Sequence, residues 1–123
     1  MHDLLCYNLF IKQYKEIEMK NINPKNMGLK SYKTQINKSG NKTEIRYQGN
    51  LIATIDNQMI TIDNCGWKSK TTKERLNVIL DYYNIDFSII QRDWKWYLIN
   101  DKTKTGERFF GTAKFFEGKL LNM

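Results

Sequence analysis

Histidine, cysteine and proline are scarce in this sequence, and the scarcity limits its chemistry. The 123 residues contain one His, two Cys and one Pro. Since His is the commonest general acid or base near neutral pH and the single one is His2, no Cys–His or Ser–His catalytic pair is expected. Cys6 and Cys65 form no C-x-x-C motif, which argues against a zinc site or a redox pair. Cys65 is predicted to be a small buried residue; the competing interpretation is a thiolate activated by Lys68 or Lys70.

Long apolar runs, phosphate-binding glycine motifs and spaced carboxylates are also missing. No run approaches the roughly 18 residues of a membrane span, and neither G-x-x-x-x-G-K nor G-x-G-x-x-G occurs. The Asp and Glu residues form no D-x-D or E-x-K set on a recognisable strand pair, as a magnesium site would need. With 41% hydrophobic residues the chain is still too apolar to be disordered. We expect one soluble domain over residues 1–123 that is not an enzyme and holds no cofactor or metal.

Acidic residues are also fewer than basic residues. The chain has 20 Lys and Arg against 13 Asp and Glu, a formal net charge of +7. Such a balance favours an anionic partner: nucleic acid, an acidic protein surface or anionic lipid. The excess is concentrated in residues 11–46. Lysine supplies most of it and Asn and Ile are abundant, so an A/T-rich genome that adds lysine without selection for binding is an equally good explanation.

Apolar periodicity predicts the first part of the fold. From Asp3 to Met19 apolar residues recur at intervals of three and four, the period of one helix face. Asn21–Gly28 should end this N-terminal helix, because Pro24 lacks an amide hydrogen and disfavours helical geometry before it. We expect that segment to be a short linker.

The rest of the chain predicts strands and one further helix. A T-x-x-E capping box at Thr71 and Glu74 begins a central helix, and Asn84 can end it in the left-handed conformation. Alternation of apolar and polar residues, interrupted by turn residues, predicts the strands. These lie near residues 32–36, 43–47, 51–55, 59–62, 85–90, 94–99 and 107–110. The order α-β-β-β-β-α-β-β-β predicts an α+β fold, a mostly antiparallel sheet covered by helices on one face.

The densest local feature is the basic segment that leads into the central helix. It places an aromatic ring and four basic side chains where helix N–H groups and the helix dipole already attract phosphate. The cations can neutralise phosphates while the ring stacks on an unpaired base. The predicted nucleic-acid-binding residues are Trp67, Lys68, Lys70, Lys73 and Arg75. A solvated basic loop, a capped helix and a buried Trp would produce the same pattern, and that alternative stays open.

Aromatic residues crowd the last third of the chain. In the run 94–97, period-2 geometry puts Trp94 and Trp96 on one face of a strand. Most of the rings should be core. Two or three, Trp96 and one Phe among them, are expected to be exposed for base stacking or as protein-interface anchors.

Residues 49–80 carry a recognisable pattern. Gly49-Asn50-Leu51-Ile52-Ala53 precedes Cys65-Gly66-Trp67 and the run Thr71–Asn77. The pattern resembles a group of small bacteriophage and mobile-element proteins with a G-N-x-I-A strand and a C-G-W…T-T-K-x-R-L-N strand-to-helix junction. Trp96-Tyr97-Leu98 and Phe116-Glu117-Gly118 are similar to the closing segments of that group. The resemblance covers residues 47–120, implies a phage or mobile-element origin, and carries over no catalytic residue.

Two functions from different classes follow. The first is a non-enzymatic accessory protein that binds nucleic acid or a nucleoprotein through its basic, aromatic surface. The alternative is a protein-directed inhibitor of a host defence system, comparable to an anti-CRISPR protein, which binds a host protein through exposed aromatic rings and docks fast because of its charge. Because the N-terminus lacks the pattern of a secretory signal, both are expected in the cytoplasm of the host cell, away from membranes.

Overall fold

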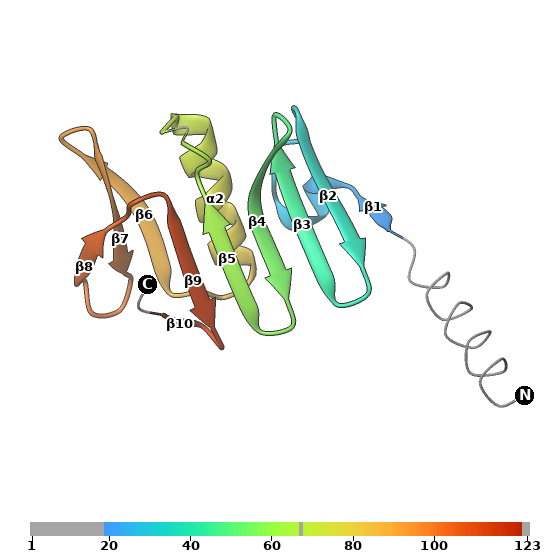
Figure 1. The fold of residues 1–123 in the computed structure, drawn as a ribbon. Coiled ribbons are helices and arrows are strands. Elements are labelled where there is room, and N and C mark those ends of the chain that lie inside the picture. Colours follow the sequence, from blue (N-terminus) through green and yellow to red (C-terminus); the bar gives the residue numbers. More distant parts are fainter. Residues whose placement is uncertain (1–18, 67, 122–123) are drawn as a thin grey trace, which may run out of the picture.

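The computed structural model describes residues 19–66 and 68–121 (Figure 1). Their largest layer is a seven-stranded sheet in the order β1-β2-β3-β4-β5-β9-β10, and a second sheet has the order β6-β7-β8. All neighbouring strands are antiparallel. The elements are β1 (Lys20–Ile22), the 3-10 helix η1 (Pro24–Met27), β2 (Thr34–Ser39), β3 (Lys42–Tyr47), β4 (Asn50–Asp56), β5 (Met59–Asp63), α2 (Lys70–Tyr82), β6 (Phe87–Arg92), β7 (Lys95–Asn100), β8 (Gly106–Arg108), β9 (Thr112–Phe116) and β10 (Lys119–Leu120).

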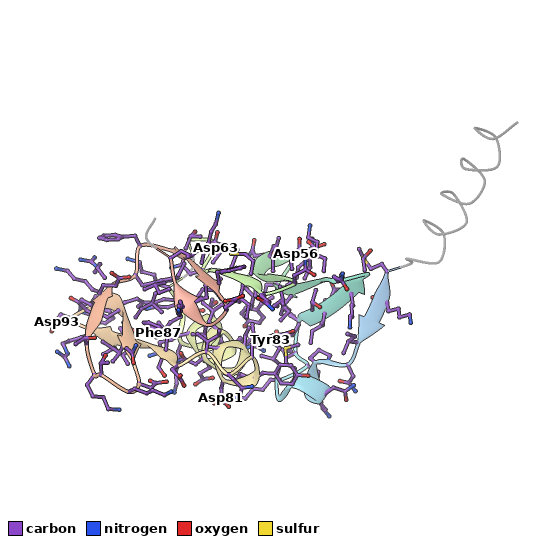
Figure 2. All side chains as sticks on the ribbon, turned by 90° about the horizontal axis from the view of Figure 1, so that it is seen from below. Asp56, Asp63, Asp81, Tyr83, Phe87 and Asp93 are labelled. Carbon is purple, nitrogen blue, oxygen red and sulfur yellow. The ribbon has the colours of Figure 1, made fainter. Side chains whose placement is uncertain are left out.

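One face of the large sheet is apolar and is covered by α2 (Figures 1 and 2). Alternation puts Ile45 of β3 and Ile62 of β5 on the covered face, and both are fully buried. In β4 the consecutive Ile52 and Ala53 are both buried, because the register with β3 shifts there by one residue. This β-bulge lets β4 contribute an additional side chain to the core.

Helix α2 also connects the two sheets. The Asn77 side chain donates from Nδ2 to the Ile89 carbonyl (3.0 Å) and accepts at Oδ1 from the Ile89 N–H (2.7 Å). It therefore pairs with β6 as a neighbouring strand would, on an edge that is otherwise open. The rings of Phe87 (β6) and Phe115 (β9) lie 5.4 Å apart, so the sheets share one core.

One predicted element falls outside the described residues, and another is corrected. The predicted N-terminal helix lies outside the described residues, apart from Met19, which is not in a helix. The predicted linker Asn21–Gly28 instead contains part of β1 and η1, and Met27 is buried in the core. Pro24 fits there because the first residue of a helical turn needs no amide hydrogen, and Asn23 caps that turn by accepting from the Lys25 N–H.

The predicted element order was also incomplete. The expected hairpins and the mostly antiparallel sheet are present, but β1, β9 and β10 were not predicted, and β6, β7 and β8 form a sheet of their own. Strand β9 pairs with β5 across the chain segment that holds α2 and the second sheet. Sequence separation hides such a pairing, because no turn connects the two strands.

The start of α2 differs from the prediction, whereas its end agrees. The N-cap is Ser69, whose Oγ accepts from the Thr72 N–H (3.2 Å), so the capping box at Thr71 is wrong. Thr71 Oγ1 instead accepts from the hydroxyl of Tyr47 (3.1 Å). At the other end Asn84 has φ 57°, the predicted left-handed conformation.

Candidate nucleic-acid interface

Several connections of the fold lie along one edge of the large sheet, the upper edge in Figure 1. Alternate strands of an antiparallel sheet run in the same direction, so the ends of β3 and β5 lie at this edge together with the start of α2. The segment after β8 joins them, because the Asn64 N–H donates to the Gly111 carbonyl (2.9 Å). The turn between β6 and β7 lies at the same edge (Figure 1). We call this surface the loop edge; it comprises the described residues 32–33, 47–50, 63–66, 68–70, 92–95 and 108–111.

The positive end of α2 contributes to the loop edge. Lys68 and Lys70 are exposed on either side of the N-cap Ser69, and Lys73 is half-buried one turn into the helix. The first turn contains no acidic residue that would offset the helix dipole. Glu74, which follows, forms an ion pair with Lys30 (3.9 Å). The start of α2 therefore combines lysine charge and helix dipole of the same sign, which is the arrangement that attracts anions.

Arg75, which the sequence placed among the phosphate contacts, lies in the interior. Its side chain is 4% exposed. It donates from Nε to Thr34 Oγ1 (2.8 Å) and from Nη2 to the Tyr32 carbonyl (3.0 Å). The guanidinium also lies 3.9 Å above the ring centre of Tyr47. Arg75 thus holds α2 against β2 and β3. It is therefore not one of the candidate nucleic-acid-binding residues at the surface.

Helical periodicity contained the signal for this burial. Arg75 lies three residues after the buried Thr72 and four before the buried Ile79, on the stripe of α2 that faces the sheet. Of the other predicted residues, Trp67 lies outside the described part of the chain. Lys68, Lys70 and Lys73 remain as the described members of the predicted site.

The exposed rings agree with the sequence-based expectation in part, because one Phe, Phe110, is exposed as expected and Trp96 is not. Trp96 is fully buried, so its predicted exposure is wrong, whereas Trp94 is 86% and Phe110 is 84% exposed. Asp93 and Trp94 form the two-residue turn between β6 and β7, with φ values of 53° and 65°. Because Trp94 belongs to the turn and not to the strand, the expected face shared with Trp96 does not exist.

Each exposed ring at the loop edge has cations beside it. Arg92 and Lys95 are exposed and pair across the β6–β7 turn that carries Trp94. The Arg108 guanidinium lies 5.3 Å from the ring centre of Phe110. A third exposed ring, Tyr32, has the Lys33 ammonium 5.3 Å from its centre. Aromatic faces and positive charges therefore alternate on this surface.

Cys65 does not have the environment of a reactive thiol. Burial raises the pKa of its thiol, and the negative charge of Asp63 raises it further. The Sγ donates to the Leu51 carbonyl (3.1 Å). Both effects disfavour the thiolate, the opposite of what activation by Lys68 or Lys70 would need.

The carboxylates are dispersed. In Figure 2 the labelled Asp81 and Asp93 lie apart from each other and from Asp56 and Asp63, and these last two end the antiparallel strands β4 and β5 at opposite edges of the large sheet. Within residues 19–66 and 68–121, no three His, Cys, Asp or Glu side chains are grouped as metal ligands. No helix in the same residues is long and apolar enough to cross a membrane.

The opposite edge of the molecule has mixed charge, which sets the loop edge apart. Its turns are joined by backbone hydrogen bonds, for example from the Asp101 N–H to the Asp86 carbonyl (2.9 Å). Both lysines and carboxylates occur there, and Lys102 forms an ion pair with Asp86 (3.1 Å). At the loop edge the acidic residues are Asp93 and Asp63, and Asp63 accepts hydrogen bonds from the Cys65 N–H and from Thr112.

These features define a small α+β protein, mostly antiparallel sheet, with a basic and aromatic loop edge. A family model described as Kyanoviridae Gp96 protein matches residues 12–122, and the chain belongs to this family of phage proteins. The phage origin that the resemblance implied is confirmed. Comparisons with curated proteins and with solved structures each found no match.

Proposed function

We propose that this phage protein binds nucleic acid through its loop edge and is not an enzyme. The observation that supports the proposal is the convergence, on one edge, of the exposed Lys68 and Lys70 with exposed rings from distant segments. Lysines next to a helix N-terminus bind phosphate groups through charge and through free backbone N–H groups. The exposed rings add flat surfaces on which bases stack.

Salt dependence tests this proposal directly. Each phosphate contact adds about 0.7 to 0.9 to the slope of log affinity against log salt. Replacing Lys68, Lys70 and Lys73 with Glu should reduce the slope by about 2 to 3 units and weaken binding to labelled DNA and RNA strongly.

A matched variant controls for net charge. Lys38, Lys42 and Lys119 are exposed and lie toward the opposite edge, so replacing these three with Glu changes the charge equally. We expect a much smaller effect on binding from this variant. Equal losses in both variants, or an unchanged slope when the loop-edge lysines are replaced in a folded protein, would contradict the proposal.

A second candidate is inhibition of a host protein, such as a component of a defence system. The exposure of Trp94 and Phe110 beside arginines favours it, because Trp and Arg are the commonest anchors of protein interfaces. Capture of one host protein from nuclease-treated lysate, lost in the Trp94→Ala variant, would support this function. Loss of the captured protein on nuclease treatment would support nucleic-acid binding instead.

A further inference from the structure

The turn between β6 and β7 and the segment after β8 form an aromatic tip at one end of the molecule. Figure 2 shows Asp93, in that turn, at the end remote from β1. The Phe109 N–H donates to the Trp96 carbonyl (2.9 Å), which holds the residue before Phe110 beside the start of β7, two residues from Trp94. The aromatic tip consists of Arg92, Trp94, Lys95, Arg108 and Phe110.

Packing of the protein does not account for the two rings of the tip. Trp94 is 86% and Phe110 is 84% exposed, so neither contributes much to the core. Trp94 also has φ 65°, a conformation that costs a bulky residue energy and that Gly or Asn adopts more easily. A residue that is strained and unpacked is better explained by a role at the surface.

Their neighbours hold the tip in place. Trp96 and Phe109 are buried, and their rings are stacked with centres 6.0 Å apart and planes 18° apart. Trp96 lies two residues after the exposed Trp94, and Phe109 directly precedes the exposed Phe110. The buried pair of rings therefore anchors the exposed pair. The two exposed rings are therefore presented on a rigid base, which lowers the entropy lost when a ligand binds.

We propose that the aromatic tip stacks the unpaired bases of single-stranded nucleic acid. This inference rests on the proposed function of the loop edge and adds the substrate class. In a duplex both faces of each internal base are covered by its neighbours, whereas a single strand offers those faces to protein rings. The cations Arg92, Lys95 and Arg108 complement the phosphates that connect the bases of the strand. They outnumber the one carboxylate of the turn, Asp93.

Fluorescence anisotropy with a labelled poly-dT oligonucleotide and with a 20-base-pair duplex tests the inference. Removing a stacking ring lowers affinity by about ten-fold per base. We expect Trp94→Ala and Phe110→Ala each to weaken oligo-dT binding by about this factor, and to leave duplex affinity and the salt slope unchanged. The matched control is Tyr82→Ala, which removes a half-exposed ring at the other end of α2 and should change neither affinity.

The outcomes separate this inference from the proposed function. Equal binding of oligo-dT by the native chain and by both tip variants overturns the inference but leaves binding by the loop-edge lysines intact. Failure of the native chain to bind either probe at low salt overturns both. Trp94→Gly is a second variant, in which Gly adopts the left-handed conformation of this turn position without steric cost. We therefore expect this variant to fold, so loss of its oligo-dT binding would be due to the missing ring.

Discussion

Replacing Arg75 with Lys should destabilise the protein and leave nucleic-acid binding intact. The guanidinium donates three hydrogen bonds, to Thr34 Oγ1 (2.8 Å), the Tyr32 carbonyl (3.0 Å) and the Thr71 carbonyl (3.2 Å). A lysine ammonium is a compact charge on a flexible stem and cannot reach three acceptors spread around a planar fork. We expect it to keep one of the three.

The size of the effect follows from these contacts. A hydrogen bond that involves a charged group contributes about 1.5 kcal/mol or more, so two lost bonds cost about 3 kcal/mol. The contact of the guanidinium with the Tyr47 ring at 3.9 Å adds about 1 kcal/mol. A total loss of about 4 kcal/mol is a large part of the roughly 5–15 kcal/mol that stabilises a domain.

Urea denaturation followed by far-UV circular dichroism measures this loss, and the salt titration measures binding. Arg46→Lys is the matched control, because Arg46 pairs with Glu44 (3.1 Å) on the open face and should lose less than about 1 kcal/mol. Similar losses in the two variants would refute the structural role of Arg75. Lysine would keep the positive charge, so the binding test uses Arg75→Gln: a salt slope reduced by nearly one unit in that folded variant would show that Arg75 binds phosphate.

Three further substitutions test other parts of the fold by the same denaturation assay. Asn77→Ala should cost about 2–4 kcal/mol, because it leaves both backbone groups of Ile89 without their partners; a loss below about 1 kcal/mol would show that water replaces the amide. Gly106→Ala should destabilise by about 1–3 kcal/mol, since a Cβ there would lie 2.8 Å from the Leu98 carbonyl oxygen; an unchanged midpoint would mean that β8 is free to move. Trp94→Gly should stabilise by roughly 0.5–1 kcal/mol, because relief of about 1–2 kcal/mol of strain exceeds the added entropy of the unfolded chain. A lower midpoint for Trp94→Gly would indicate that the exposed ring packs in solution.

Some of the fold could be predicted because it depends on neighbours in the chain. The alternation in β2 to β5 and the turn at Asn57, with φ 56°, are visible in short windows of sequence. The same holds for the central helix and for Asn84 at its end. The pairing of β9 with β5 could not be predicted, since it joins segments separated by a helix and a sheet.

For the candidate site, the sequence indicated where the positive charge gathers but only in part which side chains are exposed. The sequence indicated that cations gather before the central helix, and Lys68 and Lys70 are exposed there. Helical periodicity puts Arg75 on the sheet-facing stripe of the central helix, but the burial of its charge depends on an acceptor in β2, Thr34, which lies 41 residues away. The aromatic tip was missed because a two-residue turn at Asp93 shifts Trp94 out of the strand pattern.

The amino-acid sequence by itself determined the basic charge, the antiparallel hairpins, the single described α-helix and the resemblance to phage proteins. These properties are sums over residues or patterns of period two and 3.6, so they are independent of the partner on which each segment packs. Only the tertiary structure decided which charges and rings reach solvent. Arg75 and Trp96 are inside while Trp94 and Phe110 are outside, because burial depends on which distant segments pack together.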